Sequence, residues 1–203
     1  MQEKNQNLLL VTTLTAAVSL IFTTAVSVIQ IQTTEATHLY GNMRWSSYVA
    51  GPLCISTSMG NTNIGLTASN NALFTAYDSI NRLDSRYVIK QMANTGDCRS
   101  HVYGNSLSTG TLGVTSIGRS SSTVIIYENV AMNTNIPWTS SGCTEGYYPV
   151  RMSFAIRHEF SHWIFLKHNT VDDRTSITHP KYHCSAWDAF NSHDAGTVRA
   201  VYG

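Results

Sequence analysis

The chain has few charged residues and no concentration of either sign. Asp, Glu, Lys and Arg make up 12% of its 203 residues, about half the usual share, and the formal net charge is +1. Without a basic patch the sequence gives no electrostatic footprint for nucleic acid, and it has no acidic run typical of a disordered tail. We therefore expect a folded domain without a nucleic-acid partner.

Several short signatures are also missing. The four cysteines form no CxxC pair, which argues against a zinc ribbon, and the chain has no N-x-[ST] acceptor for N-glycosylation. No internal repeat or low-complexity run follows Tyr40. A length of about 160 residues fits one domain with its own core. We assign residues 40–203 to that domain and expect it to be a monomer.

One long uncharged run, Leu8 to Ile31, stands near the start of the chain. A helix of this length, at about 1.5 Å per residue, can span a bilayer. Ala25 and Ser27 offer small residues at the spacing of a signal-peptidase site. Residues 1–35 are therefore predicted to be a signal peptide or an N-terminal membrane anchor, and we favour cleavage. Either one makes the domain secreted or places it on the extracellular face of a membrane, which it meets only through this segment.

The even number of cysteines suits an oxidising compartment. Two disulfides are expected among four widely spaced residues, and three connectivities are open. The cysteines are Cys54, Cys98, Cys143 and Cys184.

Hydrophobic periodicity predicts both strands and helices. Strands are predicted at residues 53–58, 87–92, 98–103, 111–117 and 123–130. Helices are predicted at residues 67–83, from Pro149 in a first turn to about Phe165, and from near Ser192 onward. This order indicates an α/β or α+β domain.

The segment RHEFSHWIFLKH, Arg157 to His168, gathers three histidines and a glutamate around the end of the second helix. His158 and His162 are four residues apart, so both imidazoles project from one helical face and can bind one metal ion. Glu159 lies about 100° further around the helix and would reach the open side of the ion rather than bind it. Neutral imidazoles suit Zn²⁺, and a catalytic zinc site uses three protein ligands plus water.

A third ligand must come from beyond the helix. On a straight helix His168 would point about 120° away from His162, so the chain must turn after about Phe165 for His168 to reach the ion. No glutamate follows Glu159, which excludes zinc sites with a downstream glutamate ligand. The other candidate ligands are Asp172, Asp173 and Asp188. The competing hypothesis is a helix end with solvated histidines, since cations are favoured at helix C-termini.

These motifs are similar to those of a known protease family. HEFSHWIFLKH resembles the metzincin zinc signature HExxHxxGxxH in its three histidines and its glutamate. SITHPKY (Ser176 to Tyr182) is similar to the Met-turn segment of the matrixin branch, and SHDAGTVRAVYG resembles the closing helix of matrixin-like domains. The likeness extends over residues 45–203, with specific motifs near the C-terminus. Phe165 stands where the signature has glycine, and Thr178 where the Met-turn has methionine.

The resemblance implies a divergent, matrixin-like metzincin with an α+β fold. Such a fold has a twisted mixed sheet of about five strands, a long active-site helix, an N-terminal helix and a short C-terminal helix. One catalytic Zn²⁺ would be held by His158, His162 and His168. Glu159 would be the general base of a zinc metalloendopeptidase that acts on peptide or protein substrates. A structural Ca²⁺ is compatible with the family, although nothing in the sequence indicates one.

The resemblance also implies substrate contacts and a disulfide pairing. The pocket positions would be Tyr182, Thr178 and Pro180, and an extended peptide would pair with the edge strand at residues 111–117. The family's sheet order places Cys54 beside Cys98, which leaves Cys143 to pair with Cys184.

Two other classes of protein remain as alternatives. One is a secreted binding module with a structural zinc ion, or an inactive pseudoprotease, and the other is a membrane-tethered scaffold without metal. Glu159 favours the enzyme, because a structural site has no need for a glutamate that does not bind the metal.

Overall fold

The computed structural model describes residues 44–45, 49–83, 88–91, 98–121, 124–144, 148–164, 166–168, 175–179, 184 and 190–203. The chain divides into two units, Met1–Thr37 and His38–Gly203, and every described residue belongs to the second. The predicted signal peptide or anchor, residues 1–35, lies outside the described residues. Within those residues no helix is both long and apolar enough to cross a membrane.

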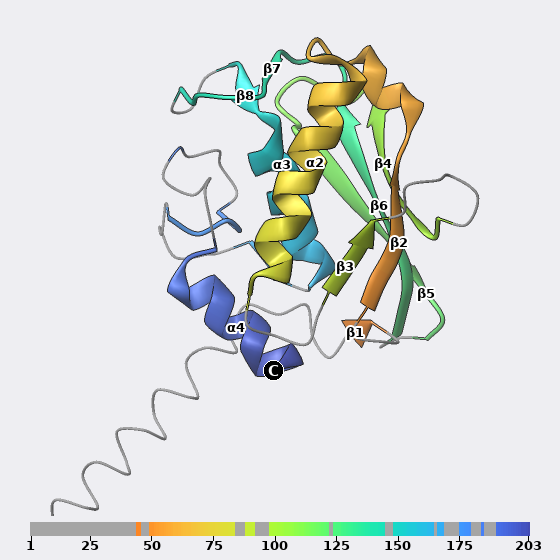
Figure 1. Cartoon of the computed structure of the whole chain (residues 1–203), viewed down its shortest axis with the longest axis vertical. Coiled ribbons are helices and arrows are strands. Elements are labelled where there is room, and N and C mark those ends of the chain that lie inside the picture. The colour runs from red at the N-terminus through yellow and green to blue at the C-terminus, as the bar shows by residue number, and fades with distance from the viewer. Residues whose placement is uncertain are drawn as a thin grey trace, which may run out of the picture. The chain divides into compact units, whose positions relative to one another are not determined.

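The second unit is built around a mixed β-sheet (Figure 1). Parallel pairing gives the order β1 (Arg44–Trp45), β6 (Val124–Asn133), β4 (Ser100–Asn105), β2 (Val49–Ile55) and β3 (Val88–Gln91). β5 (Gly113–Arg119) pairs antiparallel with β6. A separate parallel pair joins β7 (Trp138–Thr139) to β8 (Val150–Arg151). The main sheet thus has six strands, one more than expected, because the two-residue β1 gave no pattern in the sequence.

β5 is an edge strand. It pairs with β6 from Ile125 to Met132, whereas β1 pairs with β6 at Val124–Ile125 and β4 pairs with it at Asn129–Asn133. The overlapping registers place β5 on the opposite side of β6 from the two parallel strands. β6 is its only partner among the described strands, so the edge strand expected at residues 111–117 is confirmed.

In the described residues, three α-helices and one short 3-10 helix complete the α+β architecture. They are η1 (Thr57–Asn61), α2 (Gly65–Asn81), α3 (Met152–Trp163) and α4 (Ser192–Tyr202). The strand expected to reach residue 58 ends at Ile55, because the Ser56 hydroxyl caps η1 by accepting the Ser58 N–H. α2 buries Ala72, Leu73 and Ile80 on one face, as its periodicity predicted.

α3, which carries the histidine motif, begins later than expected. Pro149 was predicted in its first turn, but Val150 and Arg151 pair with β7 as strand β8, and the helix begins at Met152. The predicted length of the active-site helix is therefore wrong, since α3 has 12 residues and is shorter than α2, which has 17.

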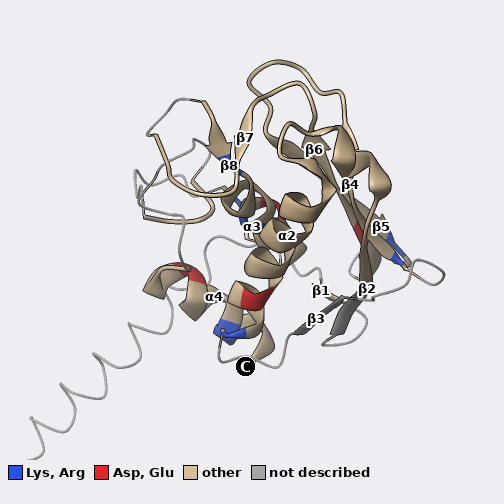
Figure 2. Ribbon diagram, turned by 45° about the horizontal axis from the view of Figure 1, so that its top comes forward, with Lys and Arg blue, Asp and Glu red and all other residues tan. Residues whose placement is uncertain are grey.

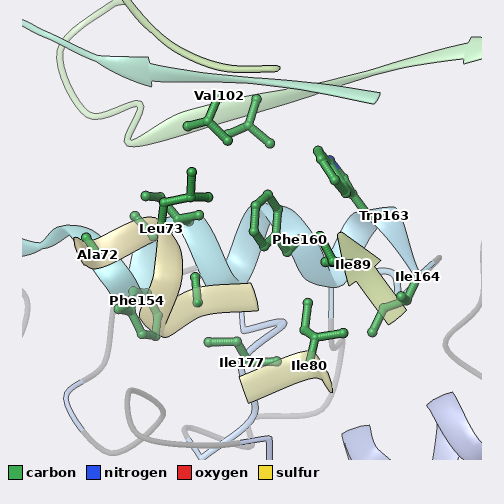
Figure 3. Close-up of a cluster of buried hydrophobic side chains, with 14 of the residues drawn as sticks. Ala72, Leu73, Ile80, Ile89, Val102, Phe154, Phe160, Trp163, Ile164 and Ile177 are labelled. Carbon is green, nitrogen blue, oxygen red and sulfur yellow. The ribbon is translucent and has the colours of Figure 1, made fainter. Parts of the chain in front are cut away.

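The core lies where α2 and α3 pack together on one face of the sheet (Figure 1). α3 is buried on nearly all sides, with ten of its 12 residues buried. Its Phe160 and Trp163 point toward the strand that carries Val102, and Leu73 and Ile80 of α2 join the same cluster (Figure 3). Burying each large apolar side chain contributes about 1.5–3 kcal/mol, so the motif helix is anchored by its packing.

Charged residues are sparse on the described elements (Figure 2). The exposed pair Asp78–Arg82, 2.7 Å apart at the end of α2, contributes about 0–1 kcal/mol because solvent screens it. Glu128 of β6 differs, because it is completely buried and neither carboxyl oxygen has a hydrogen-bond partner in the described part of the chain. Burial raises the pKa of Glu128 well above its ordinary value. Burial raises the pKa of the Tyr202 phenol in α4, and the nearby charge of Glu128 raises it further.

Two disulfides staple the unit, as expected. Cys54 of β2 bonds to Cys98, which precedes the neighbouring β4, with Cα atoms 5.7 Å apart. Cys143 bonds to Cys184 with Cα atoms 5.8 Å apart, so the pairing implied by the resemblance is confirmed. Disulfides indicate an oxidising environment of the extracellular type.

Candidate metal centre

Three imidazoles converge at the C-terminal end of α3. The ring centroids of His158 and His162 are 4.9 Å apart, and that of His168 lies 5.2 Å and 5.0 Å from them. One ring nitrogen from each lies within 4.8 Å of the others, so the three histidines could hold a metal ion.

The orientation of the rings fits zinc. Nε2 of His158 lies 3.2 Å from Nε2 of His168, and two nitrogens bound tetrahedrally to one Zn²⁺ would be about 3.3 Å apart. Nδ1 of His158 donates to the Ile177 carbonyl at 2.7 Å, and Nδ1 of His162 donates to the Leu166 carbonyl at 2.8 Å. A carbonyl oxygen can only accept, so these Nδ1 atoms carry the protons and leave a lone pair on each Nε2.

The surroundings also favour neutral imidazoles. Burial, and then the charge of neighbouring His162, lowers the pKa of His158 to about 3. Burial and His162 also lower the pKa of His168. Metal binding requires the deprotonated ring, so protons compete weakly for these two ligands.

The turn that brings His168 back to the helix is fixed by Leu166. The helix ends at Trp163, and the Leu166 N–H donates to the Ser161 carbonyl at 3.0 Å. The Leu166 side chain is 1% exposed and lies in the core. The main-chain carbonyl of Leu166 accepts the hydrogen bond from His162 Nδ1. The expected turn and approach of His168 are therefore present, while the conformation of Phe165 lies outside the described residues.

Glu159 lies beside the histidines with its carboxylate against β5. The Thr115 hydroxyl lies 2.7 Å from Glu159 Oε2 and 3.2 Å from the Glu159 carbonyl oxygen. A Cβ added to Gly113 would lie 3.1 Å from Oε1, so the carboxylate occupies the space that this glycine leaves. Burial raises the pKa of Glu159, and the hydrogen bond from Thr115 opposes that shift.

The segment Thr175–His179 supports the first ligand through Asp194 of α4. The Ile177 carbonyl accepts from His158, and the Ile177 N–H donates to Asp194 Oδ2 at 2.9 Å. Ser176 donates its hydroxyl proton to Asp194 Oδ1 at 2.9 Å. Because that proton is used, Thr178 must donate to the Ser176 oxygen, 2.7 Å away. This network satisfies the hydroxyl of Thr178, which is 1% exposed.

Several predicted site residues lie outside the described part of the chain, and several contacts of the site were not predicted. Pocket candidates Pro180 and Tyr182 lie outside the described residues, as do the alternative ligands Asp172, Asp173 and Asp188. No sequence pattern pointed to the contacts made by Thr115, Gly113, Ser176 or the Leu166 carbonyl. In the sequence, Asp194 is only an acidic residue in the first turn of a predicted helix, where most such residues are solvated.

Comparison with known proteins adds no relative. No protein-family model matches the chain, and no curated protein matches its sequence. What the chain does must therefore be inferred from its own residues.

Proposed function

We propose that this protein is a zinc-dependent endopeptidase of the metzincin type, a divergent matrixin-like member secreted or held at the extracellular face of a membrane. The observation that carries the proposal is the convergence of three imidazoles beside a buried glutamate that is not one of the ligands. The order of its strands and helices and its two disulfides agree with that assignment.

The residues divide the chemistry between binding and proton transfer. Zinc held by His158, His162 and His168 would polarise the scissile carbonyl and make a water molecule more acidic. Glu159 takes a proton from that water as it attacks, and passes it to the leaving amine.

The substrate would be an extended peptide that adds to β5. That edge has no strand partner among the described residues, and its backbone N–H and C=O groups can pair with a peptide main chain. β5 also contacts Glu159 through Thr115, so a peptide on this edge would have its main chain close to the proposed base. Main-chain pairing discriminates weakly between side chains, which favours proteins with unfolded or extended segments as substrates.

The test combines metal content with hydrolysis of casein by the purified protein. We expect about one zinc per chain, loss of that zinc in His158→Ala, and retention in His101→Ala, whose histidine lies on β4. Glu159→Gln should keep the zinc, and its hydrolysis rate should be lower by about 10²–10⁴-fold, the usual contribution of a positioned general base. A zinc-loaded wild type as inert as Glu159→Gln would identify a structural site instead. Equal hydrolysis by both proteins would remove Glu159 from the mechanism.

A further inference from the structure

Two alternate positions on β5, Gly113 and Thr115, face Glu159. Side chains on a strand alternate between the two faces of the sheet. Gly113 and Thr115 contact Glu159, whereas Val114 and Ser116 between and after them are exposed. The strand therefore presents one hydroxyl and one missing side chain to the same carboxylate.

Thr115 holds one side of that carboxylate. Its hydroxyl has one proton, and the distance of 2.7 Å to Oε2 is shorter than the 3.2 Å to the Glu159 carbonyl oxygen. A hydrogen bond to an ionised acceptor is short and about twice as strong as a neutral one. The proton therefore belongs mainly to the bond with Oε2, and the longer contact with the Glu159 carbonyl oxygen is the weaker branch of a shared hydrogen bond.

Gly113 leaves room for the other side. A Cβ at this position would lie 3.0 Å from Glu159 Cγ and 3.1 Å from Oε1, tighter than ordinary van der Waals contact. It would also meet the Ala131 carbonyl at 3.2 Å, so it could not move away from Glu159 toward β6. Among the described residues, no side-chain hydrogen bond is made to Oε1, and the Thr115 backbone N–H also acts on the carboxylate. Glycine is needed here for space.

We infer that Thr115 is a positioning residue for Glu159. By holding Oε2, the threonine leaves Oε1 as the oxygen that exchanges the proton, and Gly113 keeps that oxygen unobstructed. This inference rests on the proposed function for its catalytic meaning. Since β5 is also the edge proposed to bind the peptide, one strand would contact both the substrate and the carboxylate of the base.

The experiment compares Thr115→Val, which keeps the shape of the side chain without the hydroxyl, with Thr115→Ser, which keeps the hydroxyl. Thr75→Val is the matched control, because Thr75 lies exposed on α2 and its hydroxyl donates only to the Asn71 carbonyl. With a fluorogenic peptide substrate, Thr115→Val should lower kcat by about tenfold or more with KM within about twofold, as expected when a base is misplaced but binding is kept. Thr115→Ser should recover most of kcat, and zinc content should be unchanged throughout.

A second readout does not depend on hydrolysis. The urea midpoints of Thr115→Val, Glu159→Gln and the double variant should be non-additive, because the two side chains share one hydrogen bond. Additive midpoints would overturn the inference whatever the kinetics. Coupled midpoints with an unchanged kcat in Thr115→Val would also overturn it. Coupled midpoints in a protein without any peptidase activity would keep the positioning of Glu159 and refute the proposed function alone.

Discussion

Replacing Glu128 separates two costs that its burial imposes on the fold. A buried polar group without a hydrogen-bond partner costs about 1–3 kcal/mol, and both oxygens of this carboxyl are in that position. Glu128→Leu removes the polar atoms and should raise the free energy of unfolding by an amount within that range, reduced by any misfit of the new side chain. Glu128→Gln keeps the polar atoms and removes only the ionisation.

The ionisation makes stability depend on pH in a definite direction. Because the folded pKa of Glu128 is raised, the folded protein keeps a proton that the unfolded chain loses above the ordinary pKa of 4.5. The contribution of this group is therefore complete below that pH and declines as pH rises toward the folded pKa. The decline approaches about 1.4 kcal/mol per pH unit for a single proton.

Urea denaturation of the wild type and of Glu128→Gln, from pH 4.5 to 8 with both disulfides intact, measures this difference. Other titrating groups, including the histidines, are common to both proteins and cancel when the two free energies are subtracted. We expect the stability of Glu128→Gln relative to wild type to rise steadily with pH. Parallel curves would show that Glu128 has a partner or ionises freely, and the reasoning from its burial would be refuted.

Two further substitutions test residues that support the histidines, and a third replaces one of the histidines. Asp194→Asn should weaken zinc binding by about 10–100-fold, measured by competition with a chelator, because it loosens the Ile177 carbonyl that orients His158. Leu166→Ala should lower the urea-derived free energy of unfolding by about 2–5 kcal/mol, and a loss below about 1 kcal/mol would contradict its place in the core. His168→Ala should also weaken zinc binding in the same competition, and unchanged affinity would exclude it as a ligand.

Local patterns predicted the parts of this protein that depend on sequence spacing. The separation of His158 and His162 fixed their common face, and a β-rich composition identified β5, because both features depend on neighbours along the chain. The start of α3 could not be predicted in this way, since Val150 becomes a strand residue by pairing with Trp138. The bond between Thr115 and Glu159 joins residues 44 positions apart, and no periodicity encodes it.

β6 shows how a register irregularity defeats alternation. Alternation from the buried Ile125 would place Tyr127 on the buried face and Glu128 on the exposed face. The pairing with β5 shifts between Gly118 and Arg119, and the result is reversed: Tyr127 is 41% exposed and Glu128 is buried. An extra residue in one strand changes which face the following side chains occupy, and the hydrophobic order of the strand does not reveal it.

The acceptors that orient His158 and His162 are main-chain carbonyls, those of Ile177 and Leu166. A carbonyl persists when its side chain is exchanged, so mutations at these two positions cannot delete the hydrogen bonds directly. Substitutions at these two positions therefore leave both hydrogen bonds in place as long as the backbone path is kept. Such a site can retain its chemistry through long divergence while its sequence loses the similarity by which relatives are recognised.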